Sequence, residues 1–193
     1  MTEFNNNITK EDINLLPVVA TDNQIIVVDT PEQVEAAIND LENGDLIGFD
    51  TETKPSFRKG ERNTVSLLQL SNAKRCYLFR LQKIGRNDRI KTFLENPKVR
   101  KVGLSVRDDF RALSRWMEMA PMNFIELQFY VKAFGIEQMG LQKIFAIIFH
   151  RKISKRQQLS NWEAPHLSDA QQLYAATDAW ACREIYYQLR KEI

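Results

Sequence analysis

Stretches rich in apolar and β-branched residues alternate with amphipathic stretches in the first half of the chain. Residues 24–29 form one β-branched stretch, and Thr30-Pro31 then provides an N-cap and a first-turn proline for a helix that stops at Gly44. Further strands are expected at residues 46–51, 64–70, 75–81 and 99–104. The polar turn between the second and third of these predicts a hairpin, and a helix is expected at residues 87–95.

The pattern changes after residue 105, where apolar positions recur with a period of about 3.6 residues. This period predicts helices at residues 105–116, 126–134 and 141–149. Residues 150–168 break the period and contain a cluster of basic residues, so we expect a loop there. Ser168 then caps a long final helix. A hairpin followed by crossover helices predicts an α/β fold, in which helices flank a mixed β-sheet.

Length and composition indicate one folded domain. With 193 residues, of which 44% are apolar, the chain can bury one substantial core. Residues 1–20 are polar and are expected to form a loosely ordered N-terminal arm before a single domain at residues 21–193. The formal net charge is only +2, so any case for binding a polyanion must come from local patches.

Three features predict a soluble, cytoplasmic protein that does not bind membranes. The N-terminus lacks the charged and apolar regions of a secretory signal, and the longest apolar run, at residues 144–149, is too short to cross a bilayer. Cys76 and Cys182 lie far apart in the sequence, with no second thiol at a metal-ligand spacing. This favours a reducing compartment, in which both cysteines act as small apolar core residues.

Asp50 and Glu52 are the first candidate site residues, because they end an apolar strand. Side chains alternate across a strand, so both carboxylates point to one face. Two like charges about 4 Å apart repel by up to about 4 kcal/mol at an effective dielectric constant of about 20, unless a proton or a cation intervenes. The alternative is a solvent-exposed strand end, and D-x-E alone favours that alternative because it is common by chance.

Tyr174 and Asp178 are the second candidates, because a spacing of four residues stacks them on one face of the final helix. The same face continues with Ala181, Ile185 and Leu189, so Asp178 should face the protein body and require a partner. A buried hydrogen bond between the two side chains, or an aspartate at the edge of the helix, explains this pair equally well when the pair is considered alone.

Asp109 is the third candidate, at the point where the strand at residues 99–104 passes into a helix. An acidic residue near a helix start is commonly only a partner of the helix dipole, so Asp109 gains weight only in combination. Carboxylates without histidine or cysteine at ligand spacing select hard cations such as Mg²⁺ or Mn²⁺. Four carboxylates would balance two divalent ions, a pair that serves in-line phosphoryl displacement, and a tyrosine hydroxyl can orient the attacking water.

Together these residues resemble the DEDD 3′-5′ exonucleases, in the subgroup with a tyrosine in its third motif. Ribonuclease D and the exonuclease domain of the Werner syndrome protein have similar motifs. The motifs here are F-D-T-E, K-V-G-L-S-V-R-D-D, and L-S-N-W followed by L-Y-A-A-T-D-A, and the likeness spans roughly residues 24–190. The resemblance implies a ribonuclease H-like fold and a metal-dependent enzyme that releases nucleoside monophosphates from nucleic-acid 3′ ends.

The resemblance also implies a role for each residue. Asp50 would bridge two metal ions, Glu52 and Asp178 would complete the first, and Asp109 would reach the second. Tyr174 and Glu52 would hold the attacking water. Aligning the K-V-G of the second motif selects Asp109 over its neighbour Asp108. Many relatives have G-H-N in this motif where Leu104-Ser105 follows the glycine here, for which we expect altered substrate contacts.

Four residues are candidates for contact with the nucleic acid: Thr53, Phe57, Arg156 and Trp162. Thr53 and Phe57 follow the D-x-E and would touch the terminal nucleotide. Arg156 belongs to the basic loop at residues 151–156 and would neutralise a phosphate, although a basic loop is often only solvated. Trp162 would either stack on a base or pack against the final helix.

Two hypotheses from other classes remain open at this stage. One is a catalytically silent nucleic-acid-binding protein on the same fold, and the other is a structural cation site in a protein that does not cleave nucleic acid. The sequence does not choose between DNA and RNA as substrate, and it identifies no protein partner.

Overall fold

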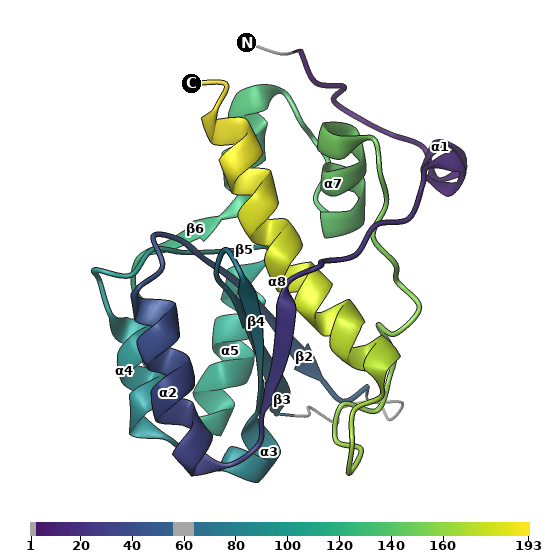
Figure 1. Ribbon diagram of the computed structural model, residues 1–193. Helices are drawn as coiled ribbons and strands as arrows, with labels where there is room; N and C mark the ends of the chain where they lie inside the picture. Colours follow the sequence, from purple (N-terminus) through teal and green to yellow (C-terminus); the bar gives the residue numbers. More distant parts are fainter. Residues whose placement is uncertain (1–2, 56–63) are drawn as a thin grey trace.

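A six-stranded sheet forms the centre of the protein, and helices cover both of its faces (Figure 1). The computed structural model describes residues 3–55 and 64–193. The strands lie in the order β1-β4-β3-β2-β5-β6. Their bounds are β1 (Gln24–Val28), β2 (Ile47–Thr53), β3 (Val65–Ser71), β4 (Arg75–Arg80), β5 (Lys101–Gly103) and β6 (Phe124–Glu126).

The sheet is mixed, as the sequence predicts. Strand β3 is antiparallel to both β2 and β4, whereas the pairs β1–β4, β2–β5 and β5–β6 are parallel. The expected hairpin of β3 and β4 is therefore confirmed. Strand β2 runs to Thr53, two residues beyond its predicted end, so the D-x-E lies within the strand and not at its end.

The helices follow the predicted pattern closely, with short additions at α1 and α3 and with the helix expected at residues 126–134 divided in two. None of the helices in the described part of the chain is both long and apolar enough to cross a membrane. Their bounds are α1 (Lys10–Leu15), α2 (Pro31–Glu42), α3 (Leu81–Ile84), α4 (Asp88–Glu95), α5 (Val106–Trp116), α6 (Leu127–Tyr130), the 3₁₀ helix η1 (Val131–Phe134), α7 (Leu141–Phe149) and α8 (Asp169–Arg190).

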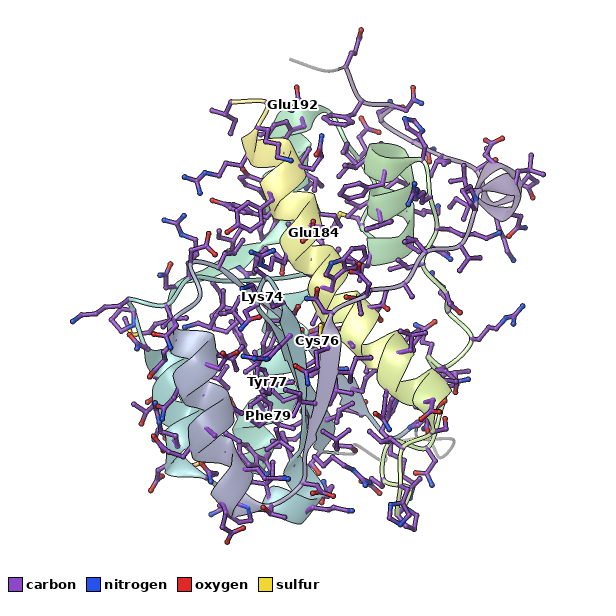
Figure 2. The ribbon with its side chains drawn as sticks, in the orientation of Figure 1. Lys74, Cys76, Tyr77, Phe79, Glu184 and Glu192 are labelled. Atoms are coloured by element: carbon purple, nitrogen blue, oxygen red, sulfur yellow. The ribbon has the colours of Figure 1, made fainter. Side chains whose placement is uncertain are left out.

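The alternation of side chains along the strands divides the core between the two faces of the sheet. Tyr77 and Phe79 of β4 pack on the face covered by α2, α4 and α5, whereas Cys76 lies on the face covered by α8 (Figure 2). Helix α8 crosses this second face and contacts every strand from β1 to β5 (Figure 1). In β2 the same alternation turns Phe49 towards the first face and leaves Gly48, Asp50 and Glu52 on the α8 face.

The region around β6 differs from the expected helix at residues 126–134. Residues 124–126 pair with β5 as a third parallel strand, and the helix that follows is divided into α6 and η1. A strand of three residues is too short to show a period of its own, so the pairing with β5 decides its conformation.

The N-terminal segment also differs from the loosely ordered arm that its polarity suggested. It contains α1, capped by Thr9, and its apolar residues Phe4 and Ile8 pack against the core beside α7. Val18 forms a bridge to Lys152, whose ammonium group also donates a 2.6 Å hydrogen bond to the carbonyl of Asn14. A few apolar side chains in a polar segment are thus enough to fix residues 3–20 to the domain.

Gly48 is the point where α8 comes closest to the sheet. A Cβ atom at this position would lie 2.0 Å from the carbonyl oxygen of Ala179 and 2.9 Å from its carbonyl carbon, which no side chain can do. The residues of α8 that face the sheet are small: Ala175, Ala176 and Ala179 are all fully buried there. Asp50 follows Gly48 on the same face of β2 and Asp178 precedes Ala179, so this contact brings the two aspartates together.

We expect Gly48→Ala to destabilise the protein, because the clash is with a backbone atom that no rotamer change can move. Overpacked interiors typically lose about 1–3 kcal/mol, and sometimes more, which urea unfolding followed by circular dichroism would measure. Gly140→Ala is the matched control: its Cβ would meet no atom within 4 Å, and its φ is −101°. The control should stay within about 1 kcal/mol of the wild type. Equal stability of Gly48→Ala and wild type would contradict the close approach.

Candidate functional site

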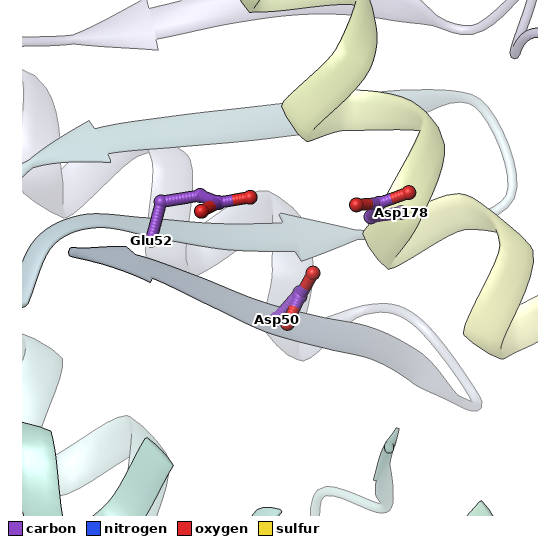
Figure 3. A group of neighbouring side chains, drawn as sticks. All are labelled: Asp50, Glu52 and Asp178. Atoms are coloured by element: carbon purple, nitrogen blue, oxygen red, sulfur yellow. The ribbon is translucent and has the colours of Figure 1, made fainter. Parts of the chain in front are cut away.

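Three carboxylates from β2 and α8 converge on the α8 face of the sheet. Asp50, Glu52 and Asp178 each offer a carboxylate oxygen, and these atoms all lie within 4.8 Å of one another. Figure 3 shows the side chains of the two β2 residues and that of Asp178 directed into a common space. The structure therefore brings together the D-x-E of β2 and the aspartate of α8, although Glu52 and Asp178 are 126 residues apart in the sequence.

Burial raises the pKa of each of these carboxyl groups, and repulsion by neighbouring carboxylates raises those of Asp50 and Glu52 further. Burial holds the pKa of Asp50 well above its usual range, and the charge of Asp178 raises it further. Burial, with smaller contributions from Asp50 and Asp178, raises the pKa of Glu52 to about 10. The pKa of Asp178 rises to about 7, again through burial, while a hydrogen bond from Tyr174 and the charge of Lys155 limit the rise. The group retains protons at neutral pH unless a cation replaces them.

This donor set fits a hard divalent cation. The ligand atoms are carboxylate oxygens only, which is the set that Mg²⁺ and Mn²⁺ prefer over zinc. Without a cation, the three negative charges repel one another and destabilise the fold. A bound cation would instead attract all three carboxylates. Cys182, one turn beyond Asp178, is fully buried, and burial raises the pKa of its thiol, so it stays protonated and is not a metal ligand.

Tyr174 lies one turn before Asp178 on α8 and is only 9% exposed. Burial raises the pKa of its phenol, and the charges of Asp178 and Glu52 raise it further, so the hydroxyl keeps its proton and acts as a hydrogen-bond donor. Ser168 caps this helix, as the sequence predicts, and the structure adds a capping box with Gln171. The tyrosine and the aspartate therefore share one rigid helical face directed at β2.

Trp162 packs against Tyr174 and does not face solvent. The two ring centroids are 5.9 Å apart, and Trp162 is 1% exposed, so the indole has no open face for a base. The packing alternative for Trp162 is what the structure shows. Arg80 fixes the loop that carries it, because its guanidinium donates to the carbonyls of Ala164 and Pro165.

Asp109, in the first turn of α5, does not share the 4.8 Å space of the three carboxylates, but it lies near enough to Asp50 to feel its charge. Thr51 Oγ1 donates a 2.5 Å hydrogen bond to Asp109 Oδ1, and the pKa of Asp109 lies well above its usual range, mainly through burial and then through the charge of Asp50. Its neighbour Asp108 has a 77% exposed side chain that pairs with Arg111 at 3.0 Å. The carboxylate of α5 that faces Asp50 is therefore Asp109, as the sequence alignment of K-V-G suggested.

Glu126 holds the start of α5 and was not identified from the sequence. Ser105 precedes the helix with a left-handed φ of 59° and makes no side-chain cap. Instead the carboxylate of Glu126, at the end of β6, accepts hydrogen bonds from the backbone N–H groups of Ser105 at 2.9 Å and Val106 at 2.8 Å. Because Asp109 lies in the first turn of α5, this distant cap fixes its position.

A pocket of about 370 Å³ opens above the carboxylates. Its far wall is formed by Leu104, Ser105, the start of α7 and the loop after it, and Lys155 from that loop also lines it. Arg156, which we expected to contact phosphate, lines a neighbouring apolar pocket instead. Thr53 is half-buried at the end of β2, where the pairing with β3 shifts in register, and Phe57 lies outside the described residues. Lys155 is thus the cation of the basic loop nearest the carboxylates.

Comparisons with known proteins agree with this geometry. A family model described as 3′-5′ exonuclease matches residues 25–193. The mouse bifunctional 3′-5′ exonuclease/ATP-dependent helicase WRN is 32% identical over 155 residues, which is 77% of this chain and 11% of the mouse protein. The chain therefore spans a small part of that relative.

Solved structures share the fold. The EXO domain of Aedes aegypti Nibbler superposes with a TM-score of 0.81 at 23% identity, covering 90% of this chain and 92% of that domain. Ribonuclease D of Escherichia coli, described as an exoribonuclease involved in structured RNA processing, gives a TM-score of 0.77 at 21% identity. That match covers 89% of this chain and 45% of the bacterial one. The neighbours have ribonuclease H-like exonuclease folds, as the sequence motifs implied.

The raised pKa values predict that the metal-free protein loses stability as the pH rises. A carboxyl whose pKa is higher in the folded state stabilises the fold below its unfolded pKa and loses that contribution as the pH passes the folded value. This window runs from 3.8 to about 7 for Asp178 and from 4.5 to about 10 for Glu52. We expect the melting temperature of the chelated protein to fall from about pH 5 to about pH 9, and Mn²⁺ to restore it at the higher pH.

The matched control for this experiment is Asp50→Asn, which keeps the shape of the side chain and removes one of the repelling charges. The chelated variant should show a flatter dependence of melting temperature on pH and a smaller stabilisation by Mn²⁺. A wild-type melting temperature that responded neither to pH in this range nor to the metal would contradict the electrostatic account.

Glu126→Ala should loosen the start of α5. The two N–H groups lose their acceptor, which typically costs about 1–2 kcal/mol for a helix cap, and the amides of Ser105 and Val106 should exchange their hydrogens faster. Hydrogen exchange measured by mass spectrometry or NMR would follow this directly. Asp108→Ala, which removes an exposed carboxylate from the same helix turn, should leave exchange at both amides unchanged; equal effects of the two variants would refute the capping role.

Proposed function

The chain belongs to the 3′-5′ exonuclease family, and on this premise we propose that it hydrolyses phosphodiester bonds at nucleic-acid 3′ ends and releases nucleoside monophosphates. The observation that carries the proposal is the convergence of Asp50, Glu52 and Asp178 on the floor of an open pocket. Three neighbouring carboxylates that cannot all be ionised without a cation destabilise a fold. A functional metal site is the best explanation for their presence.

We propose that the pocket binds two divalent cations, either Mg²⁺ or Mn²⁺. Asp50, Glu52 and Asp178 would hold the first, and Asp50 together with Asp109 would hold the second. Thr51 occupies one oxygen of Asp109 and leaves the other as a ligand atom. When bound, such a pair lowers the pKa of a coordinated water and neutralises charge that develops on the leaving oxygen.

The residues of the chain would then orient the reacting groups. Tyr174 keeps its phenolic proton, because its pKa is raised, and would donate that hydroxyl to the attacking water or to an oxygen of the scissile phosphate. Glu52 would accept a hydrogen bond from the same water. Lys155 lines the pocket and would offset the charge of the phosphate, the role that we had expected of Arg156.

The proposed substrate is the 3′ end of a DNA or RNA strand. A single strand suits a pocket of about 370 Å³, because the terminal nucleotide must leave its stack to enter it. The same fold has been solved for ribonuclease D of Trypanosoma brucei in complex with RNA U12, with a TM-score of 0.77 at 20% identity. This supports a nucleic acid as ligand, and the choice between DNA and RNA belongs to the experiment that follows.

We expect the purified protein to shorten 5′-labelled single strands one nucleotide at a time in Mg²⁺ or Mn²⁺. DNA and RNA of the same sequence should be compared on sequencing gels, with a circular single strand as a substrate that has no end. Asp50→Ala should abolish the ladder, and Tyr174→Phe should slow it by roughly 10²-fold while Mn²⁺ still binds.

Asp108→Ala is the matched control for the acidic variants, since Asp108 is exposed and paired with Arg111. It should degrade the strand at the wild-type rate. Intact DNA and RNA ends after incubation of the wild type with both metals would refute the proposed activity. Strand binding without shortening would instead favour a catalytically silent binding protein on the same fold.

A further inference from the structure

Phe129 is an exposed aromatic ring close to the pocket. It lies on α6 with 57% of its surface exposed, and it is the one exposed aromatic residue in the described part of the chain. A single exposed apolar side chain is common and by itself has no functional meaning. The residues around this ring distinguish it from such a case.

Two cations from neighbouring elements lie over the ring. The guanidinium of Arg107, in the first turn of α5, lies 6.0 Å from the ring centroid, and the ammonium of Lys132, in η1, lies 5.6 Å from it. Both side chains belong to exposed residues, and neither forms an ion pair with any carboxylate among residues 3–55 and 64–193. The nearby carboxylate of Asp108 is occupied by Arg111 at 3.0 Å.

A short path connects this cluster to the catalytic pocket. The side-chain amide of Gln128, the residue before Phe129, donates to Ser105 Oγ at 2.8 Å and to the carbonyl of Met139 at 2.9 Å. Ser105 and Met139 both line the pocket above the carboxylates. These hydrogen bonds attach α6 to the wall of the pocket, and Phe129 is the next residue of the same helix.

We propose that Phe129, Arg107 and Lys132 form a subsite for a single-stranded nucleic acid, in which Phe129 stacks on a base upstream of the 3′ end and the two cations contact phosphates. This inference rests on the proposed function, because the terminal nucleotide in the pocket fixes where the strand begins. An exposed aromatic ring with two cations over it matches a strand that alternates bases with phosphates, because a base that stacks on the ring displaces a cation from it towards the neighbouring phosphate. Stacking tolerates any base, so the subsite would add affinity without sequence preference.

The binding experiment uses a 5′-fluorescein-labelled single strand and fluorescence anisotropy without divalent cations, so that no cleavage occurs. We expect Phe129→Ala to weaken binding by about fivefold or more, the effect of losing one stacked base. Phe129→Trp should bind at least as tightly as the wild type. A strand with abasic nucleotides upstream of its 3′ end should bind the wild type and Phe129→Ala equally.

The two cations are tested through the salt dependence of the same binding. The double variant Arg107→Ala/Lys132→Ala should reduce the slope of log affinity against log salt by about 1.4, as expected for two lost contacts to a single strand. Lys74→Ala/Lys98→Ala is the charge-matched control, since Lys74 lies in the β3–β4 turn (Figure 2) and Lys98 precedes β5 at its opposite end from Ser105. Its slope should equal that of the wild type.

Failure of the subsite and failure of the proposed function give different results. If the wild type cleaves no strand, the exonuclease proposal fails. The anisotropy data still show whether Phe129 contributes to strand binding. Wild-type affinity of Phe129→Ala for the base-bearing strand would overturn the subsite, as would equal weakening on base-bearing and abasic strands. Where cleavage occurs, a trinucleotide short enough to fill only the pocket should be cut by Phe129→Ala at the wild-type rate.

Discussion

The contact between Gly48 of β2 and the carbonyl of Ala179 on α8 decides where the acidic groups lie. It allows a long helix to approach a strand more closely than any side chain would permit. Asp50 and Asp178 flank this contact, one on each element, so their separation is set by backbone packing and not by flexible side chains. The buried alanines of α8 extend the same close fit along the sheet.

The rigid placement of the acidic groups has an electrostatic cost, which a bound divalent cation would relieve. Packing holds three carboxylates together at the floor of the pocket, and burial with the neighbouring charges raises the pKa values of Asp50 and Glu52 there. Pre-organised acidic groups need little rearrangement when a cation binds, so the destabilisation of the empty site becomes affinity for the ion. Thr51 adds Asp109 to this arrangement, because its hydroxyl links that carboxylate to the strand that carries Asp50 and Glu52.

Much of this arrangement could be predicted from the sequence. The residues that sequence patterns missed are those whose role depends on contacts between distant parts of the chain. Strand alternation places Asp50 with Glu52, and helical spacing places Tyr174 with Asp178, because both depend on local geometry. Glu126 could not be found this way, since it caps a helix that begins 20 residues earlier in the chain. In the basic loop, Lys155 and Arg156 are neighbours without a regular period, so only the folded structure shows which of them lines the pocket.

The N-terminal segment illustrates how the limits of a family and of a folded unit can differ. The family match begins at residue 25, yet the segment before it bridges Lys152 and packs beside α7. Lys152 belongs to the same loop as Lys155, three residues before the cation that lines the pocket. A stretch that carries none of the shared motifs thus supports the loop that lines the pocket. A change of sequence in this stretch would shift that loop without altering any of the acidic residues.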